Sequence, residues 1–112
     1  MPRRDARLLI EDLSIAIGRI EKYVAGLDCD HFLADEKTVD AVIRNLEIIG
    51  EASRQMPEDF KQSHQTIPWH QIAGLRNRIV HDYFGIDQEL IWQIVSIEIP
   101  ILKQFIDSLD LD

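Results

Sequence analysis

Residues 36–56 read EKTVDAVIRNLEIIGEASRQM, and apolar side chains recur in this stretch every three or four positions. That spacing is the period of an α-helix with one buried face. Asp35 supplies a suitable N-cap, and Pro57 closes the helix because proline has no backbone N–H to donate. The stretch therefore predicts a long amphipathic helix. Its apolar stripe consists of Val39, Val42, Ile43, Leu46, Ile49 and Met56.

Two further segments show the same helical period. The first covers about residues 5–25 and stops at Gly26. The other opens near Pro68, a residue tolerated in a first helical turn, and is broken at Gly85. The polar stretch 57–67 between the helices has room for one short helical turn. The apolar stripes of the two segments are Leu9, Leu13, Ile17, Ile20 and Val24, and Ile72, Leu75 and Ile79.

The last helical segment begins after Asp87, which is a suitable N-cap, and runs to about Leu109. Ile86 and Ile91 stand at the two positions of a hydrophobic staple. Pro100 lies inside the segment, so we expect one missing backbone hydrogen bond and a bent axis there. Its apolar stripe is Leu90, Ile94, Ile101, Leu102, Phe105 and Leu109.

These patterns predict an all-α fold, an up-and-down bundle of four main helices plus a short connecting helical turn. No stretch alternates polar and apolar residues as a strand does. A length of 112 residues, with 46% hydrophobic and 29% charged, suits one domain over residues 1–112 with one modest core. The last segment is apolar over a wide arc, and a two-fold dimer would cover the residues beside its main stripe. Those residues are Ile91, Trp92, Val95 and Ile99.

Composition indicates a cytoplasmic protein. The single Cys29 cannot form an internal disulfide, and acids follow the first short apolar run, so we expect no signal peptide. No apolar stretch approaches the ~18 residues that span a bilayer, so we expect no membrane association. The net charge of −8 argues against non-specific coating of nucleic acid, which depends on Lys and Arg. It leaves room for a nuclease with a short basic footprint.

Residues 76–84, RNRIVHDYF, stand out in this acidic chain. One interpretation is a helix end, where cations interact favourably with the helix dipole. The other is RNA cleavage without a metal, in which His81 transfers protons and Arg76 stabilises charge on phosphorus. On a straight helix these two residues would point about 140° apart. A shared site would then need arginine's reach, an irregular helix end, or two copies meeting across a dimer axis.

Other candidate sites are weak, so we expect neither a metal nor a cofactor. No two histidines have the i, i+4 spacing of a helical zinc site, and no glycine-rich loop precedes a helix. Arg44, Glu47 and Glu51 share one helix face, which predicts a solvated ion-pair stripe. The histidines are His31, His64, His70 and His81.

The pattern Arg76-Asn77-x-x-x-His81-x-Tyr83 resembles the motif of the HepT-like branch of the HEPN superfamily. It lies within GLRNRIVHDYFGID, residues 74–87, and is supported by IPWHQIAGLRN and RNLEIIGEASR upstream. The resemblance spans nearly the whole chain. It implies a dimeric, metal-independent endoribonuclease that acts as a toxin beside an MntA-type nucleotidyltransferase antitoxin, with the active site at or near the two-fold interface.

The resemblance also implies roles for individual residues. Arg76 and His81 would be the catalytic pair, with Asn77 and Arg78 as the polar residues beside them. Tyr83 would be the tyrosine that the antitoxin modifies with AMP. Transfer RNA is one substrate class of the family, although nothing in the sequence selects it. Two alternatives stay open: a non-catalytic dimeric module that the nucleotidyltransferase binds and modifies, and a purely structural helical dimer.

Overall fold

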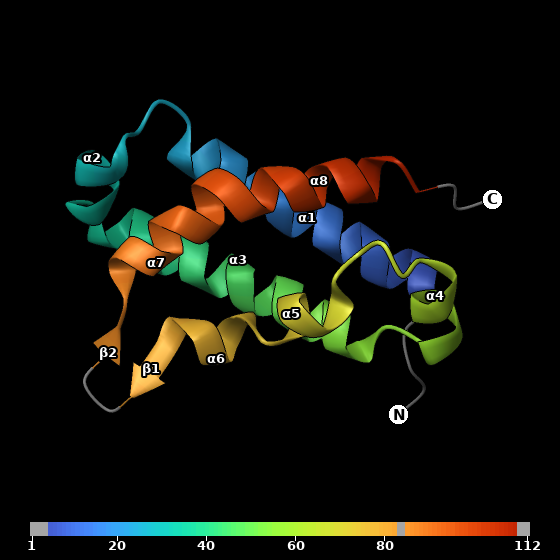
Figure 1. The fold of residues 1–112 in the computed structure, drawn as a ribbon. Helices are drawn as coiled ribbons and strands as arrows, with labels where there is room; N and C mark the ends of the chain where they lie inside the picture. Colours follow the sequence, from blue (N-terminus) through green and yellow to red (C-terminus); the bar gives the residue numbers. More distant parts are fainter. Residues whose placement is uncertain (1–4, 83–84, 110–112) are drawn as a thin grey trace.

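A computed structural model describes the backbone of residues 5–82 and 85–109 and the side chains of residues 5–79 and 87–109. This part of the chain is almost entirely helical, as predicted, and Figure 1 shows the helices lying roughly side by side. In chain order the elements are α1 (Ala6–Val24), α2 (Cys29–Leu33), α3 (Glu36–Gln55), α4 (Glu58–Ser63), α5 (Trp69–Ala73), α6 (Leu75–Ile79), β1 (Val80–Asp82), β2 (Gly85–Ile86), α7 (Gln88–Gln93), the π-helical turn η1 (Ile94–Glu98) and α8 (Ile99–Asp107).

The two long helices α1 and α3 form the centre of the bundle and pack against each other along their length (Figure 1). Both begin after a capping aspartate: Asp5 accepts from the Leu8 N–H, and Asp35, the predicted cap, accepts from the Thr38 N–H. Helix α1 ends at Val24, and Gly26 follows with a φ of +79°, a conformation that glycine adopts without strain. The predicted bounds of both helices are therefore confirmed to within a residue.

The third predicted helix is broken into two short pieces. Helix α5 ends at Gly74, whose N–H donates to the His70 and Gln71 carbonyls, and α6 begins directly after it. We expected the helix to continue toward Gly85, but it ends at Ile79. The chain then turns into β1, which pairs antiparallel with β2. This small hairpin was not predicted, because a pairing of only two or three residues leaves no alternating pattern in the sequence.

The last helix is continuous but contains the π-helical turn η1 just before Pro100. The Ile99 N–H donates to the Ile94 carbonyl, five residues back, which is the π-helical bond. A proline ring clashes with the carbonyl four residues earlier, here Ser96, and a wider turn relieves that clash. The irregularity expected at Pro100 is thus a π turn in the five residues before it.

The π turn inserts one residue and shifts the register of everything after it. Leu102 therefore occupies the core position that a regular helix would give to Ile101, which is 49% exposed. The assignment of Ile101 to the buried stripe was wrong for this reason. We also expected Ile91, Trp92, Val95 and Ile99 to face a dimer partner. That expectation is wrong for Ile91, Val95 and Ile99, because these three side chains are buried in the protein's own core.

A single core joins all the helices except α4. Helix α2, which was not predicted, contributes the fully buried Phe32, whose ring lies 5.2 Å from that of Trp92 on α7. Helix α4 is the short turn expected between residues 57 and 67, and its Phe60 packs partly buried against the core. No helix in the described part of the chain is long and apolar enough to cross a membrane.

Candidate active site

Helix α6 carries the first half of the motif and is held in place by its apolar residues. Leu75 and Ile79 are 3% and 1% exposed, while Arg76 and Asn77 between them are exposed to solvent. A helix of five residues is not stable on its own, so contacts with the rest of the bundle must fix its orientation. Its buried side chains direct Arg76 outward, where an arginine can reach a substrate.

Arg78 points back to the bundle and binds Glu98 of the π turn. Its Nη1 and Nη2 atoms donate to the two carboxylate oxygens at 2.7 and 2.8 Å, in the fork-like geometry that is strongest for this pair. The hydrogen bonds from Arg78 to Glu98 raise the pKa of Arg78, against an opposing effect of desolvation. Glu98 had not been singled out, because twenty residues separate it from its partner and local spacing gives no signal.

His81 lies in β1, directly after the end of α6. The ladder pairs Val80 with Ile86, and the Asp87 N–H donates to the Ile79 carbonyl at 3.4 Å. The backbone that carries His81 is therefore tied down on both sides, at the end of α6 and at the start of α7. The His81 side chain and the whole of Tyr83 lie outside the described residues.

This backbone path changes the geometric argument about the motif. The 140° separation of Arg76 and His81 assumed one straight helix through both residues. Because the helix ends at Ile79 and extended backbone follows, that angle no longer applies. Of the three ways in which both residues could serve one site, an irregular helix end is present in the described backbone. That Arg76 and His81 share one site stays a prediction.

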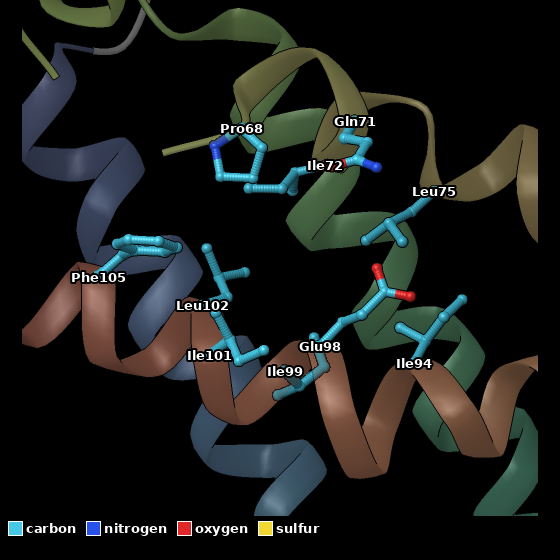
Figure 2. Close-up of a pocket in the computed structure, with 10 residues that line it drawn as sticks. All are labelled: Pro68, Gln71, Ile72, Leu75, Ile94, Glu98, Ile99, Ile101, Leu102 and Phe105. Atoms are coloured by element: carbon cyan, nitrogen blue, oxygen red, sulfur yellow. The ribbon is translucent and has the colours of Figure 1, made fainter. Parts of the chain in front are cut away.

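An apolar groove of about 250 Å³ runs between α5 and α8, beside α6 (Figure 2). Figure 2 shows the Glu98 carboxylate at its edge, pointing toward Leu75, with Pro68 and Phe105 at the opposite end. The groove's lining is mainly hydrocarbon, with Gln71 and Glu98 as its polar residues. Its one acidic residue, Glu98, already binds Arg78, so the groove suits an apolar partner better than a nucleotide.

Two other expectations concern polar side chains away from the motif. On α3, Glu51 accepts three hydrogen bonds from Arg54 and a further one from Gln55. Together with Arg44 and Glu47, Glu51 lines a shallow groove, so the three residues share one face as predicted, but the ion pair recorded for Glu51 is with Arg54 and not with Arg44. In the part of the chain that the structure describes, no three His, Cys, Asp or Glu residues form a group able to hold a metal.

Comparison with known proteins identifies the family. The model of the ribonuclease HepT-like family matches residues 13–109, which include both halves of the motif. The chain belongs to the HepT-like ribonuclease family. A HepT-like relative from Thermococcus cleftensis, named probable ribonuclease HepT, is 45% identical over 101 residues, covering 90% of this chain and 92% of that protein.

Two further HepT-like relatives come from Methanocaldococcus jannaschii, and both are named as putative RNases. One is 42% identical and covers 89% of this chain and 83% of its own length. The other is 36% identical, and the match covers 96% of this chain and 98% of that protein. No solved structure matches the chain.

Proposed function

We propose that this HepT-like protein is a metal-independent endoribonuclease that acts as the toxin of a toxin–antitoxin pair. The observation that carries the proposal is the position of Arg76, exposed on α6, three residues before the end of the helix, after which the hairpin that carries His81 begins. Arg78, the other arginine of the motif, is held by Glu98. Arg76 is therefore the arginine better placed to reach a substrate phosphate.

The chemistry needs no group beyond these side chains and the RNA. The 2′-hydroxyl attacks the adjacent phosphorus and gives up its proton, with His81 assisting proton transfer. The bond from phosphorus to the 5′-oxygen breaks, and that oxygen takes a proton. Arg76 stabilises the negative charge that builds up on the phosphoryl oxygens. The products are a 2′,3′-cyclic phosphate and a 5′-hydroxyl, and DNA is not cleaved because it lacks the nucleophile.

The test is cleavage of a mixed RNA, including tRNA, by purified protein in excess EDTA. We expect wild-type protein to cleave, and Arg76→Ala and His81→Ala to lose cleavage while keeping the helical circular dichroism of the wild type. Arg19→Ala is the matched control, because Arg19 is an exposed arginine on α1, outside the motif. Loss of activity in EDTA, or normal cleavage by both motif variants, would overturn the proposed mechanism.

The proposal includes a homodimer with the site near the two-fold axis. Ile97 and Ile101 are 59% and 49% exposed, and Ile101 lines the apolar groove beside Glu98. Two such side chains next to an apolar groove are typical of a protein contact surface. Ile101→Glu should therefore shift the protein from dimer to monomer in sedimentation. Ile15→Glu on α1, whose isoleucine is 47% exposed, is the matched control and should stay dimeric.

The proposed antitoxin is an MntA-type nucleotidyltransferase that adds AMP to Tyr83. Tyr83 is two residues from His81 in the sequence, so nucleotide phosphates on it would place negative charge and bulk beside Arg76. The substrate's own phosphate would then be excluded. This control fits the acidic protein, whose catalytic positive charge is confined to a short segment.

A further inference from the structure

One segment of this acidic chain contains no acidic residue. Residues 60–81 hold none of the 20 Asp and Glu residues, whereas an even distribution would place about four there. The same 22 residues contain three of the four histidines, together with Lys61, Arg76 and Arg78. The segment forms α5, α6, most of α4 and the first two residues of β1, and these elements follow one another along one edge of the molecule in Figure 1. The acidic residues of these elements, Glu58, Asp59 and Asp82, lie at the two ends of that edge, and a polyanion meets the least repulsion between them.

The edge is hollowed between α4 and α5 into a groove of about 720 Å³. Its lining is rich in side chains that recognise RNA: the cation of Lys61, the imidazole of His70, and the amides of three glutamines. Amide side chains both donate and accept hydrogen bonds, so they can bind 2′-hydroxyls and base edges. The glutamines are Gln62, Gln65 and Gln71.

The floor of the groove is built before any ligand arrives. Trp69 is 5% exposed, and its indole N–H donates to the His64 carbonyl at 3.1 Å. Phe60 packs its ring against both Trp69 and His64. A fixed floor lowers the ordering cost of binding, which favours a ligand that contacts the rim.

The few charged side chains of the groove suit a short contact of moderate affinity with an RNA strand. Arg54 lies at the rim and pairs with Glu51, and both side chains are more than half exposed. Glu58 is the acidic residue of the lining. Lys61 therefore supplies the principal positive charge for phosphate.

We propose that this groove binds the RNA strand on one side of the cleaved bond. His70, on the groove, precedes Arg76 by six residues across the break at Gly74, so the chain between them spans at most about 22 Å. A strand that leaves the groove along α5 therefore reaches α6 within a few nucleotides. The inference rests on the proposed function, because it is Arg76 that marks the cleaved phosphate.

The test compares Lys61→Glu with Lys37→Glu, which makes the same charge change on the exposed N-terminal turn of α3. RNA binding is measured by fluorescence anisotropy in the non-cleaving His81→Ala protein, across a series of salt concentrations. We expect Lys61→Glu to weaken binding about tenfold and to lower the salt slope by about 0.7, the value of one single-strand phosphate contact. In the cleaving protein it should raise KM and leave kcat within about twofold. Lys61→Ala, which adds no repulsive charge, should give the same lower slope.

Each outcome separates the groove from the catalytic proposal. Equal RNA affinity of Lys61→Glu and Lys37→Glu would overturn the proposal that the groove binds RNA, whether or not the protein cleaves RNA. If the wild type does not cleave RNA but Lys61→Glu still weakens RNA binding, the groove is supported as an RNA-binding site and the proposed function is overturned. A wild-type protein that binds no RNA at all would overturn both.

Discussion

Replacing Glu98 with glutamine removes the charge that Arg78 binds while keeping the shape of the side chain. The pair joins α6 to the π turn through bonds of 2.7 and 2.8 Å, and its side chains are 33% and 42% exposed. Pairs of this exposure lie at the upper end of the range for surface ion pairs, about 1 kcal/mol, because both nitrogens of the guanidinium fork are used. We therefore expect Glu98→Gln to lower Tm by about 4 °C.

The same substitution should also lower the rate of cleavage, by more than the small loss of folding stability would explain. Helix α6 is too short to hold its own orientation, and the Arg78–Glu98 pair fixes its rotation two residues from Arg76. A small misplacement of a catalytic group is costly, and we expect kcat to fall about tenfold. Glu51→Gln is the control, because it disrupts an arginine–glutamate pair of the same chemistry that is local to α3.

The assay is a double-mutant cycle of Glu98→Gln with Arg78→Met, followed by urea denaturation and by cleavage kinetics at saturating RNA. A coupling free energy below about 0.3 kcal/mol would show that the two side chains act independently and would refute the argument. So would a kcat for Glu98→Gln equal to that of Glu51→Gln. Coupling near 1 kcal/mol with a selective loss of kcat would establish the pair as a positioning element for Arg76.

Three further predictions concern other parts of the chain. Gly26→Ala should destabilise the protein by about 1 kcal/mol in urea denaturation, because Gly26 has a φ of +79°; unchanged stability would contradict this. The hydrogen bond from His31 to Asp28 raises the pKa of His31 above 6.5, so its stabilising effect is complete below pH 6.5 and is lost as pH rises through the higher folded-state pKa. Asp28→Asn should lower the His31 midpoint in an NMR titration, and an unmoved midpoint would exclude the bond. Tyr83→Phe should gain no AMP mass from the nucleotidyltransferase and ATP and should keep cleaving RNA in their presence, whereas inhibition without modification would favour the interaction-module alternative.

The sequence was most informative where the physics is local. Asp35 and Asp87 were recognisable as N-caps, and the structure shows each accepting a backbone N–H three residues later. The buried faces of α1 and α3 follow from a 3.6-residue period alone. Caps, stops and periodicity depend on residues within a few positions, so one sequence is enough to recognise them.

What was missed depends on contacts between distant residues or on a register change. The pairing of Arg78 with Glu98 is a tertiary contact, and the early end of α6 accompanies pairing of Val80 with Ile86. The shift that exposes Ile101 arises from one extra residue in η1, which a strict helical period cannot represent. The motif itself could be located in the sequence, but its backbone path could not.

The central claim is that Arg76 and His81 cleave RNA through the substrate's own 2′-hydroxyl. Mass spectrometry of the ends produced from a short RNA in excess EDTA tests it most directly. We expect 2′,3′-cyclic phosphate and 5′-hydroxyl ends from the wild type, and no cleavage at the same bond when its 2′-hydroxyl is replaced by hydrogen. A 5′-phosphate product, or cleavage of the deoxy-substituted bond, would show that water is the nucleophile and would contradict the claim.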